Sequence, residues 1–224
     1  MRSTDTVTPA RIREKLQMDI IKETIKNLQK RRFHAYYAKD GGEAKEQVLA
    51  LIPPEKSVGI GGSMTIRGLG LYEALKERGN TVWSHWLGEE TFTKAQFEGE
   101  RTADIYLCSS NAVMAKGALV NTDGLGNRAA YMFHGPETVV LVCGKNKIVS
   151  GGYEEAIKRV KNIAAPQNVR RLGFTKNPCY GTGRCYDCYS QDRICSVTTI
   201  IEEPTKEPFA REYHIILVDQ ELGF

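Results

Sequence analysis

Four cysteines near the end of the sequence combine a reactive residue type with a spacing that suits metal chemistry. Cys179, Cys185, Cys188 and Cys195 form the pattern C-x5-C-x2-C-x6-C in a loop expected to span residues 177–195. Four thiolates so placed are ligands for an iron–sulfur cluster or for zinc. Zinc held by four cysteines commonly uses two C-x2-C steps, and only one is present. Disulfides or metal-free thiols are the third alternative.

Glycines and tyrosines within the same loop favour the iron–sulfur alternative. Gly181 and Gly183 leave backbone N–H groups able to approach sulfide or thiolate. Tyr180, Tyr186 and Tyr189 are expected to shield part of a cluster. A metal there could also act only as a staple, contributing folding free energy without redox turnover.

Length and composition restrict the class of protein. The chain has 224 residues, 41% hydrophobic and 26% charged, which suits a folded domain and excludes disorder. A formal charge of +4 is too small to indicate nucleic-acid binding, and no apolar run is long enough to span a membrane. Residues 1–13 lack an apolar leader segment, so a cytoplasmic, reducing location is expected. Cys108 and Cys143 lie in apolar strands and are expected to be buried.

A second candidate site follows a short apolar strand at 58–60. Gly61 and Gly62 lead to Ser63, where a helix is expected to begin, with Thr65 in its first turn. Free backbone N–H groups and the positive end of a helix dipole favour a phosphate or carboxylate. The alternative is a tight turn in which Ser63 only caps the helix.

A third candidate site is the polar, glycine-containing loop 121–128, which follows an apolar strand at 118–120. Asn121, Asp123 and Gly124 are expected to orient a ligand, and Arg128 to pair with its anionic group. Turn formation alone is the alternative. Because ligands bind beyond the carboxyl ends of parallel strands, both loops are expected to meet in one crevice.

The rest of the chain supplies the scaffold. Short apolar strands alternate with helices, which predicts an α/β fold with a mainly parallel sheet and helices on both faces. We expect an N-terminal amphipathic helix and first strand in residues 1–40, and one α/β domain in residues 41–224. Strands are predicted at 33–38, 58–60, 81–85, 103–108, 118–120, 139–143, 197–202 and 214–219. Helical segments are predicted at 9–30, 43–51, 112–116 and 153–163.

The four histidines are interpreted mainly as structural or surface residues. His34, His85 and His214 occur in predicted strands and are interpreted as structural. His134 precedes a Gly-Pro turn and is interpreted as a surface or capping residue, with a site role as the alternative.

Several stretches in order resemble the LUD domain family, the lactate-utilisation proteins with the NagB/RpiA/CoA-transferase-like fold. The resemblance spans about residues 10–220, nearly the whole chain. The matching stretches are Val58–Thr65, Ala103–Tyr106, Gly117–Asn121 and Ile163–Asn168, followed by Arg170-Arg171. The cysteine pattern is similar to that of a stand-alone subgroup of this family.

The resemblance implies a function in organic-acid, lactate-type redox metabolism. Relatives of the fold bind anionic groups at strand ends, so a small anionic metabolite is the expected ligand, and an iron–sulfur protein the expected redox partner. The chain lacks a separate ferredoxin-like segment, and we place no glutamate nucleophile of the CoA-transferase type. Whether the protein is an enzyme stays open. The alternatives are a non-catalytic metabolite or redox sensor, with the N-terminal helix supporting a homodimer, and an acyl-CoA or sugar-phosphate enzyme by fold analogy.

Overall fold

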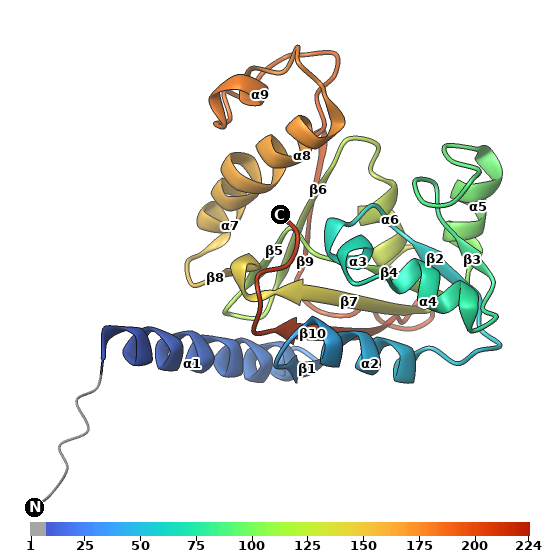
Figure 1. Ribbon diagram of the computed structural model, residues 1–224, viewed down its shortest axis with the longest axis horizontal. Helices are drawn as coiled ribbons and strands as arrows, with labels where there is room; N and C mark the ends of the chain where they lie inside the picture. The colour runs from blue at the N-terminus through green and yellow to red at the C-terminus, as the bar shows by residue number, and fades with distance from the viewer. Residues whose placement is uncertain (1–7) are drawn as a thin grey trace, which may run out of the picture.

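A computed structural model describes residues 8–224, with the backbone alone described for residues 10–14, and places a six-stranded sheet at its centre (Figure 1). All pairs of neighbouring strands in this sheet are parallel, as predicted. The strand order is β1 (His34–Ala38), β10 (Glu212–Val218), β7 (Thr138–Gly144), β4 (Ile105–Cys108), β2 (Val58–Ile60) and β3 (Val82–Trp83). Because β1 pairs with β10, the strand expected in the N-terminal segment 1–40 belongs to the same sheet as the rest.

A second sheet, which the sequence did not predict, packs beside the first. Its order is β8 (Ile148–Val149), β5 (Ala112–Met114), β6 (Leu119–Asp123) and β9 (Val197–Ile201). The helical turn predicted at 112–116 is therefore wrong, because the three apolar residues of β5 are buried in this sheet. The loop predicted from 121 is also wrong in its first part, since β6 continues to Asp123 and pairs with β9.

Helices cover the sheets and connect the strands. Their bounds are α1 (Pro9–Lys30), α2 (Gly41–Leu51), α3 (Met64–Gly68), α4 (Leu71–Glu77), α5 (Lys94–Thr102), α6 (Asn127–Phe133), η1 (Lys145–Lys147), α7 (Tyr153–Arg159), η2 (Val160–Ala164), α8 (Ala165–Leu172) and α9 (Pro178–Thr182). Helix α2 begins two residues earlier than predicted because the Asp40 side chain accepts a hydrogen bond from the Glu43 N–H and so caps it.

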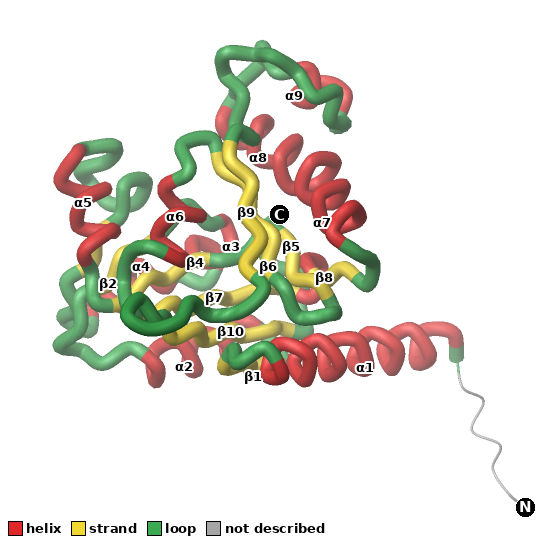
Figure 2. Tube along the Cα trace, turned by 180° about the vertical axis from the view of Figure 1, so that it is seen from behind, coloured by secondary structure: helices red, strands yellow, loops and turns green. Residues whose placement is uncertain are grey.

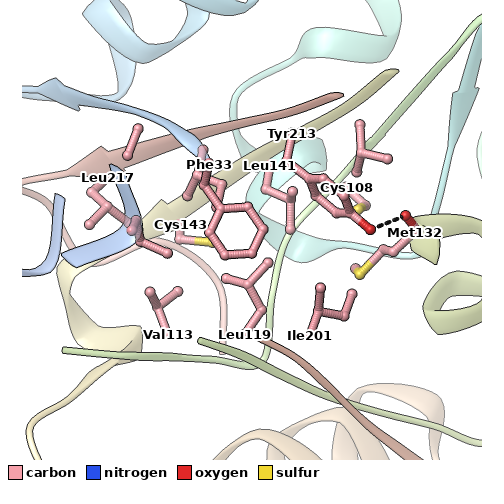
Figure 3. Packing of buried hydrophobic residues seen from close by; sticks show 14 of the residues in the cluster. Phe33, Cys108, Val113, Leu119, Met132, Leu141, Cys143, Ile201, Tyr213 and Leu217 are labelled. Atoms are coloured by element: carbon pink, nitrogen blue, oxygen red, sulfur yellow. Dashed lines mark hydrogen bonds between the residues drawn. The ribbon is translucent and has the colours of Figure 1, made fainter. Parts of the chain in front are cut away.

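The main core lies between the two sheets (Figure 3). Strand β7 shows the alternation that builds it. Val139, Leu141 and Cys143 point toward the second sheet, whereas Val140 and Val142 point toward the opposite face. Cys108 is buried in the same core as Cys143, which confirms both predictions of buried thiols.

Helices α2, α3 and α4 cover the other face of the central sheet, and α7 with η2 covers the outer face of the second sheet (Figures 1 and 2). Helix α1 matches its predicted bounds. Its C-terminal half packs Ile21 and Leu28 into the main core, while Leu16 in its N-terminal half is exposed.

Segments α7, η2 and α8 form one continuous helix from Tyr153 to Leu172, longer than the predicted 153–163. Pro166 lacks an N–H and its ring crowds the preceding turn, which would kink a regular α-helix. The chain widens to a π-helical turn at Val160–Ala164 just before this proline, and the helix continues to Leu172, where Gly173 caps it. No helix among residues 8–224 is long and apolar enough to cross a membrane.

Candidate functional site

A cleft of about 490 Å³ opens at the carboxyl ends of β2, β4 and β7. Strand β3 lies next to β2 at the edge of the sheet, and the chain then returns to form β4 on the opposite side of β2, so the strand order reverses there. Ligand sites in open parallel sheets occur at such a reversal. Helix α8 and the end of β6 complete the walls.

The two predicted loops meet in this cleft, as expected. Gly62 and Ser63 line one part, and Asp123, Gly124 and Arg128 line another. These five residues come from segments about 60 positions apart in the sequence.

The other three predicted ligand contacts lie behind the cleft. Gly61 packs against the Tyr106 hydroxyl, which leaves no room for a side chain. Thr65 is buried and donates a hydrogen bond to the carbonyl of Leu222. Asn121 is fully buried. These residues position their neighbours and are not among the residues that line the cleft.

Ser63 both caps a helix and lines the cleft. Its hydroxyl accepts a hydrogen bond of 3.3 Å from the N–H of Ile66. Helix α3 has only five residues, so its dipole supplies little positive charge. The predicted anion site therefore needs charged side chains.

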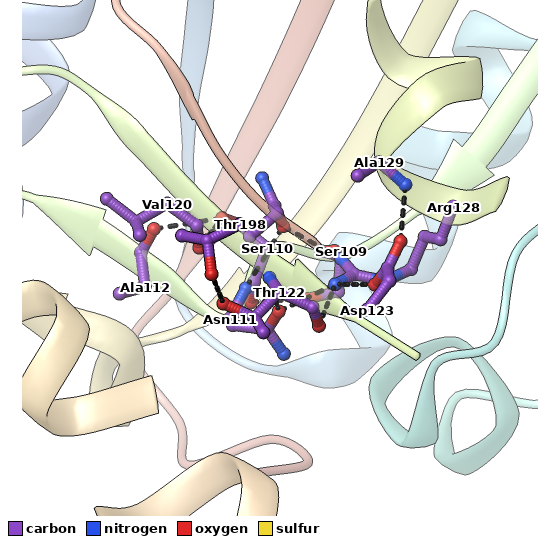
Figure 4. Close-up of polar contacts among 11 residues, drawn as sticks. Ser109, Ser110, Asn111, Ala112, Val120, Thr122, Asp123, Arg128, Ala129 and Thr198 are labelled. Carbon is purple, nitrogen blue, oxygen red and sulfur yellow. Dashed lines mark hydrogen bonds and ion pairs between the residues drawn. The ribbon is translucent and has the colours of Figure 1, made fainter. Parts of the chain in front are cut away.

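Arg128 is saturated by protein acceptors (Figure 4). Its Nη1 donates to the carbonyl of Ser109 and to Asn121 Oδ1, both at 2.7 Å. Its Nη2 donates to Asn111 Oδ1 and Asp123 Oδ1, both at 2.6 Å. The guanidinium ties the end of β4 to the end of β6, and its charge is balanced by Asp123. The predicted pairing of Arg128 with a ligand anion is replaced by this internal network.

Asp123 is equally committed to the protein. Besides the pair with Arg128, its Oδ2 accepts a hydrogen bond of 2.6 Å from the N–H of Ala129, in the first turn of α6. A carboxylate at the start of a helix is favourably placed. Asp123 is the only carboxylate side chain that the described lining residues contribute to the cleft.

Lys147 is a lining residue that sequence reasoning missed. It lies in η1 directly after β7, is 4% exposed, and donates to Thr65 Oγ1 and Ser109 Oγ, both at 2.9 Å. Within residues 8–224 no carboxylate lies within ion-pair distance of its ammonium group. Burial lowers the pKa of Lys147 to about 8. Its position four residues beyond the predicted buried strand 139–143, where ligand sites of parallel sheets occur, was the signal that could have found it.

Two further cations lie at the rim. Arg67 and Arg171 are exposed, and their guanidinium carbons lie 6.0 and 5.5 Å from the centre of the Trp86 ring. Desolvation and the nearby charge of Arg67 lower the pKa of Arg171. With Lys147 and Arg128, the lining side chains carry four cations against the one carboxylate of Asp123, a positive excess among the side chains.

His85 lies in the cleft, although the sequence suggested a structural residue. Glu100 is fully buried, and its Oε1 accepts from both the backbone N–H and the ring Nδ1 of His85, each at 2.6 Å. Burial raises the pKa of the Glu100 carboxyl. Glu100 lies in α5, 15 positions from His85, so the spacing in the sequence did not indicate that the two residues pair. His134 is exposed and does not line the cleft.

The cysteine loop lies beyond α8 (Figure 1). Ile194, next to Cys195, lines the cleft, and its backbone lies against Gly124. The N–H of Ser196 donates a 2.9 Å hydrogen bond to the carbonyl of Asp123. The cysteine loop and the cleft are therefore neighbours.

The four cysteines of this loop are free and partly exposed. Among the described residues, no three His, Cys, Asp or Glu side chains come close enough to hold one metal ion. Burial, followed by the charges of Cys188, Cys195 and Cys185, raises the pKa of the Cys179 thiol. The thiols thus lie near one another without converging on a point.

Side chains around the cysteines hold the loop in shape. Arg193 donates to the carbonyls of Cys188 and Cys195, at 2.6 and 3.2 Å, and pairs with Asp187. The N–H of Asp187 donates to Cys185 Sγ at 3.3 Å.

The tyrosines of the loop do not shield it as expected. The exposed fraction is 36% for Tyr180, 62% for Tyr186 and 98% for Tyr189, so these rings face solvent. The shielding expected from the sequence is absent from this arrangement.

Comparison with known proteins identifies the family. The model of the LUD domain matches residues 21–218. A crystal structure of a DUF162 family protein from Deinococcus radiodurans shares the fold, with a TM-score of 0.55 and 14% identity over 90% of this chain and 98% of that chain. No curated protein matches the sequence. The chain belongs to the LUD domain family.

Proposed function

We propose that the protein binds a small organic anion, a carboxylate of the lactate type, in the cleft at the carboxyl ends of β2, β4 and β7. The observation that carries the proposal is Lys147, a buried ammonium group that lines the cleft without a carboxylate partner among the described residues. A buried charge is costly unless an opposite charge compensates it. A bound carboxylate would supply that charge.

The surroundings of Lys147 support the same class of ligand. The cleft volume of about 490 Å³ is in the range of small-molecule sites. Arg67 and Arg171 at the rim add positive potential, which favours entry of an anion. Ser63 and Ser109 provide hydroxyl groups for polar contacts with the ligand.

Thermal unfolding in the presence of L-lactate, pyruvate or inorganic phosphate tests this proposal. Wild-type protein should be stabilised by the carboxylates, since a ligand that binds only the folded state raises the midpoint. Lys147→Met should remove most of that shift. Lys145→Met is the matched control, because Lys145 pairs with Asp219 and does not line the cleft. Equal shifts in wild type and Lys147→Met would contradict the proposal.

We further propose that Cys179, Cys185, Cys188 and Cys195 hold an iron–sulfur cluster rather than a single zinc ion. Zinc would draw four thiolates to about 3.8 Å from one another, given a tetrahedral Zn–S distance of about 2.3 Å. A cluster keeps its thiolates farther apart because iron and sulfide lie between them. The support for the cluster is the spacing C-x5-C-x2-C-x6-C, which has one C-x2-C step where four-cysteine zinc sites commonly have two.

Such a cluster would supply one-electron transfer at the wall of the cleft. The four cysteines would be its ligands, and the Asp187 N–H would hydrogen-bond one thiolate. Anaerobic purification with iron, sulfide and zinc analysis tests this. Iron and sulfide should be present, and each Cys→Ser variant should lose them. Stoichiometric zinc without iron would overturn the cluster and leave the anion site untouched.

A further inference from the structure

His85 and Glu100 form a pair that anion binding alone does not require. Glu100 Oε1 lies 2.6 Å from His85 Nδ1 and also accepts from the His85 backbone N–H. Because a carboxylate only accepts hydrogen bonds, this contact assigns the ring proton to Nδ1 and the lone pair to Nε2. The ring is held by Phe97, stacked at 4.7 Å between centroids, and by Phe92, edge-on at 5.5 Å. Both the tautomer and the plane of the imidazole are therefore fixed by neighbouring side chains.

The free nitrogen of His85 opens toward the cleft. A Cβ atom added to Gly62 would lie 3.9 Å from His85 Nε2 and would have no other neighbour within 4 Å, so the space between Gly62 and the ring is open. Within residues 8–224, Nε2 makes no hydrogen bond to the protein. An imidazole oriented by a buried carboxylate, with its other nitrogen free in a cleft, is the arrangement of a general base.

We propose that His85 and Glu100 are the acid–base pair of this cleft, acting on a short carboxylate with an acidic hydrogen on the carbon next to a carbonyl group. This inference rests on the proposed anion site, because the bound carboxylate must be present for the step to occur. His85 is the group that exchanges the proton, and Glu100 is a positioning residue.

The proposed step is a reversible proton transfer that needs only groups already in the cleft. The C–H bond breaks, its proton joins His85 Nε2, and its electron pair forms the C=C bond of an enolate. The carbonyl π pair moves to oxygen, where the Lys147 ammonium offsets the new negative charge. Return of the proton from Nε2 to carbon restores the starting compound. Removal of the hydroxyl proton of a hydroxy acid would not lead to oxidation, because the hydride on the same carbon would also need an acceptor.

Exchange of carbon-bound hydrogen for deuterium tests the proposal. Pyruvate and 2-oxobutyrate are incubated with the protein in D2O, and loss of the proton signal is followed by NMR. Wild type should accelerate exchange over buffer, and His85→Gln should lose about 100-fold or more of the enzymatic rate. His134→Gln is the matched control and should keep the wild-type rate, because His134 is exposed outside the cleft.

Glu100→Gln separates a chemical role from a structural one. The carboxylate offsets the positive charge that His85 gains when it takes the proton, so Glu100→Gln should slow exchange while pyruvate still stabilises the variant as it does the wild type. The nitrogen shifts of the neutral His85 ring in folded wild-type protein should show a proton on Nδ1 and none on Nε2. An Nε2–H tautomer would overturn the inference without any variant.

The outcomes for the two proposals differ. If pyruvate and 2-oxobutyrate stabilise the wild type but their exchange is not accelerated, or is unchanged in His85→Gln, the acid–base pair is wrong and the anion site stands. If no carboxylate stabilises the protein, the anion site is wrong and the acid–base pair fails with it.

Discussion

Arg128 and Lys147 line the same cleft, but their charges are balanced in different ways. Arg128 directs both terminal nitrogens to four acceptors at 2.6–2.7 Å and pairs with a carboxylate. Among residues 8–224, Lys147 donates hydrogen bonds only to the hydroxyl groups of Thr65 and Ser109. Both side chains are largely buried. The first cation completes the fold, and the second has charge available for a ligand.

This difference shows why an arginine in a polar loop need not bind the ligand. The ends of β4 and β6 present several carbonyl and amide oxygens that need donors, and the guanidinium of Arg128 satisfies them. An ammonium group has three donors and no planar fork, so Lys147 cannot replace it there. Each residue type suits its own environment.

Removing Arg128 should have the largest effect on stability. Arg128→Met leaves the buried Asp123 carboxylate uncompensated and deprives Ser109, Asn111 and Asn121 of their donor. We expect a loss of about 3–5 kcal/mol in the free energy of unfolding. Urea unfolding measures it. Arg101→Met, which breaks only an exposed pair, is the control and should cause no measurable change. A similar midpoint for both variants would show that the network is not structural.

Lys147 should make stability depend on alkaline pH. Its folded pKa of about 8 lies below the ordinary value of 10.5, so the folded state favours the neutral amine. The unfolded chain binds more protons between these values, and stability should therefore rise with pH from about 8 to about 10.5. Relative to Lys147→Met, wild type should gain roughly 3 kcal/mol over this range. Parallel curves for the two proteins in urea unfolding would contradict the burial of a charged amine.

Asp123→Asn should convert Arg128 from a balanced cation into a free one. The variant should lose stability because a buried guanidinium loses its carboxylate, by about 3 kcal/mol. It should also bind pyruvate more tightly, by about tenfold, since a second charge becomes available. Calorimetric titration compares the dissociation constants. Weaker binding in this variant would place Asp123 among the ligand contacts, as the sequence first suggested.

The rim cations should have the smallest effect. Arg67 and Arg171 are exposed, and solvent screens their charges. Replacing either by Gln should weaken anion binding by about two- to fivefold and reduce its dependence on salt. Binding at low and high ionic strength measures this effect. A larger loss for Arg171→Gln than for Lys147→Met would move the anion site from the floor of the cleft to its rim.

Local patterns predicted the parallel sheet and the meeting of two loops. Gly62, Ser63 and Asp123 follow apolar strands, and parallel strands bring their carboxyl ends together. Predictions of where single elements begin and end were wrong where pairing with a segment distant in the sequence decides the local structure. Residues 121–123 look like a polar loop, but pairing with β9 extends the strand.

The chemical roles were harder to predict than the positions. The polar, glycine-containing loop before Arg128 is typical of a ligand site, yet the N–H groups of Arg128 donate to Ser109 and Asn111 of the protein itself. His85 was interpreted as a structural strand residue. Its partner Glu100 is brought to it by the packing of α5, which the sequence does not show. No pattern in the sequence reports which donors the fold itself consumes, and this decides what a site has left for a ligand.

The affinity for pyruvate as a function of pH tests the central claim about Lys147 most directly. Calorimetric titration from pH 6 to pH 10 compares wild type with Lys147→Met. Because the ammonium form of Lys147 holds the anion and is lost as pH rises through about 8, wild-type affinity should be highest below pH 8 and fall about tenfold per unit above it. The variant should bind weakly, with no such fall. The same affinity and the same pH profile in both proteins would contradict the account.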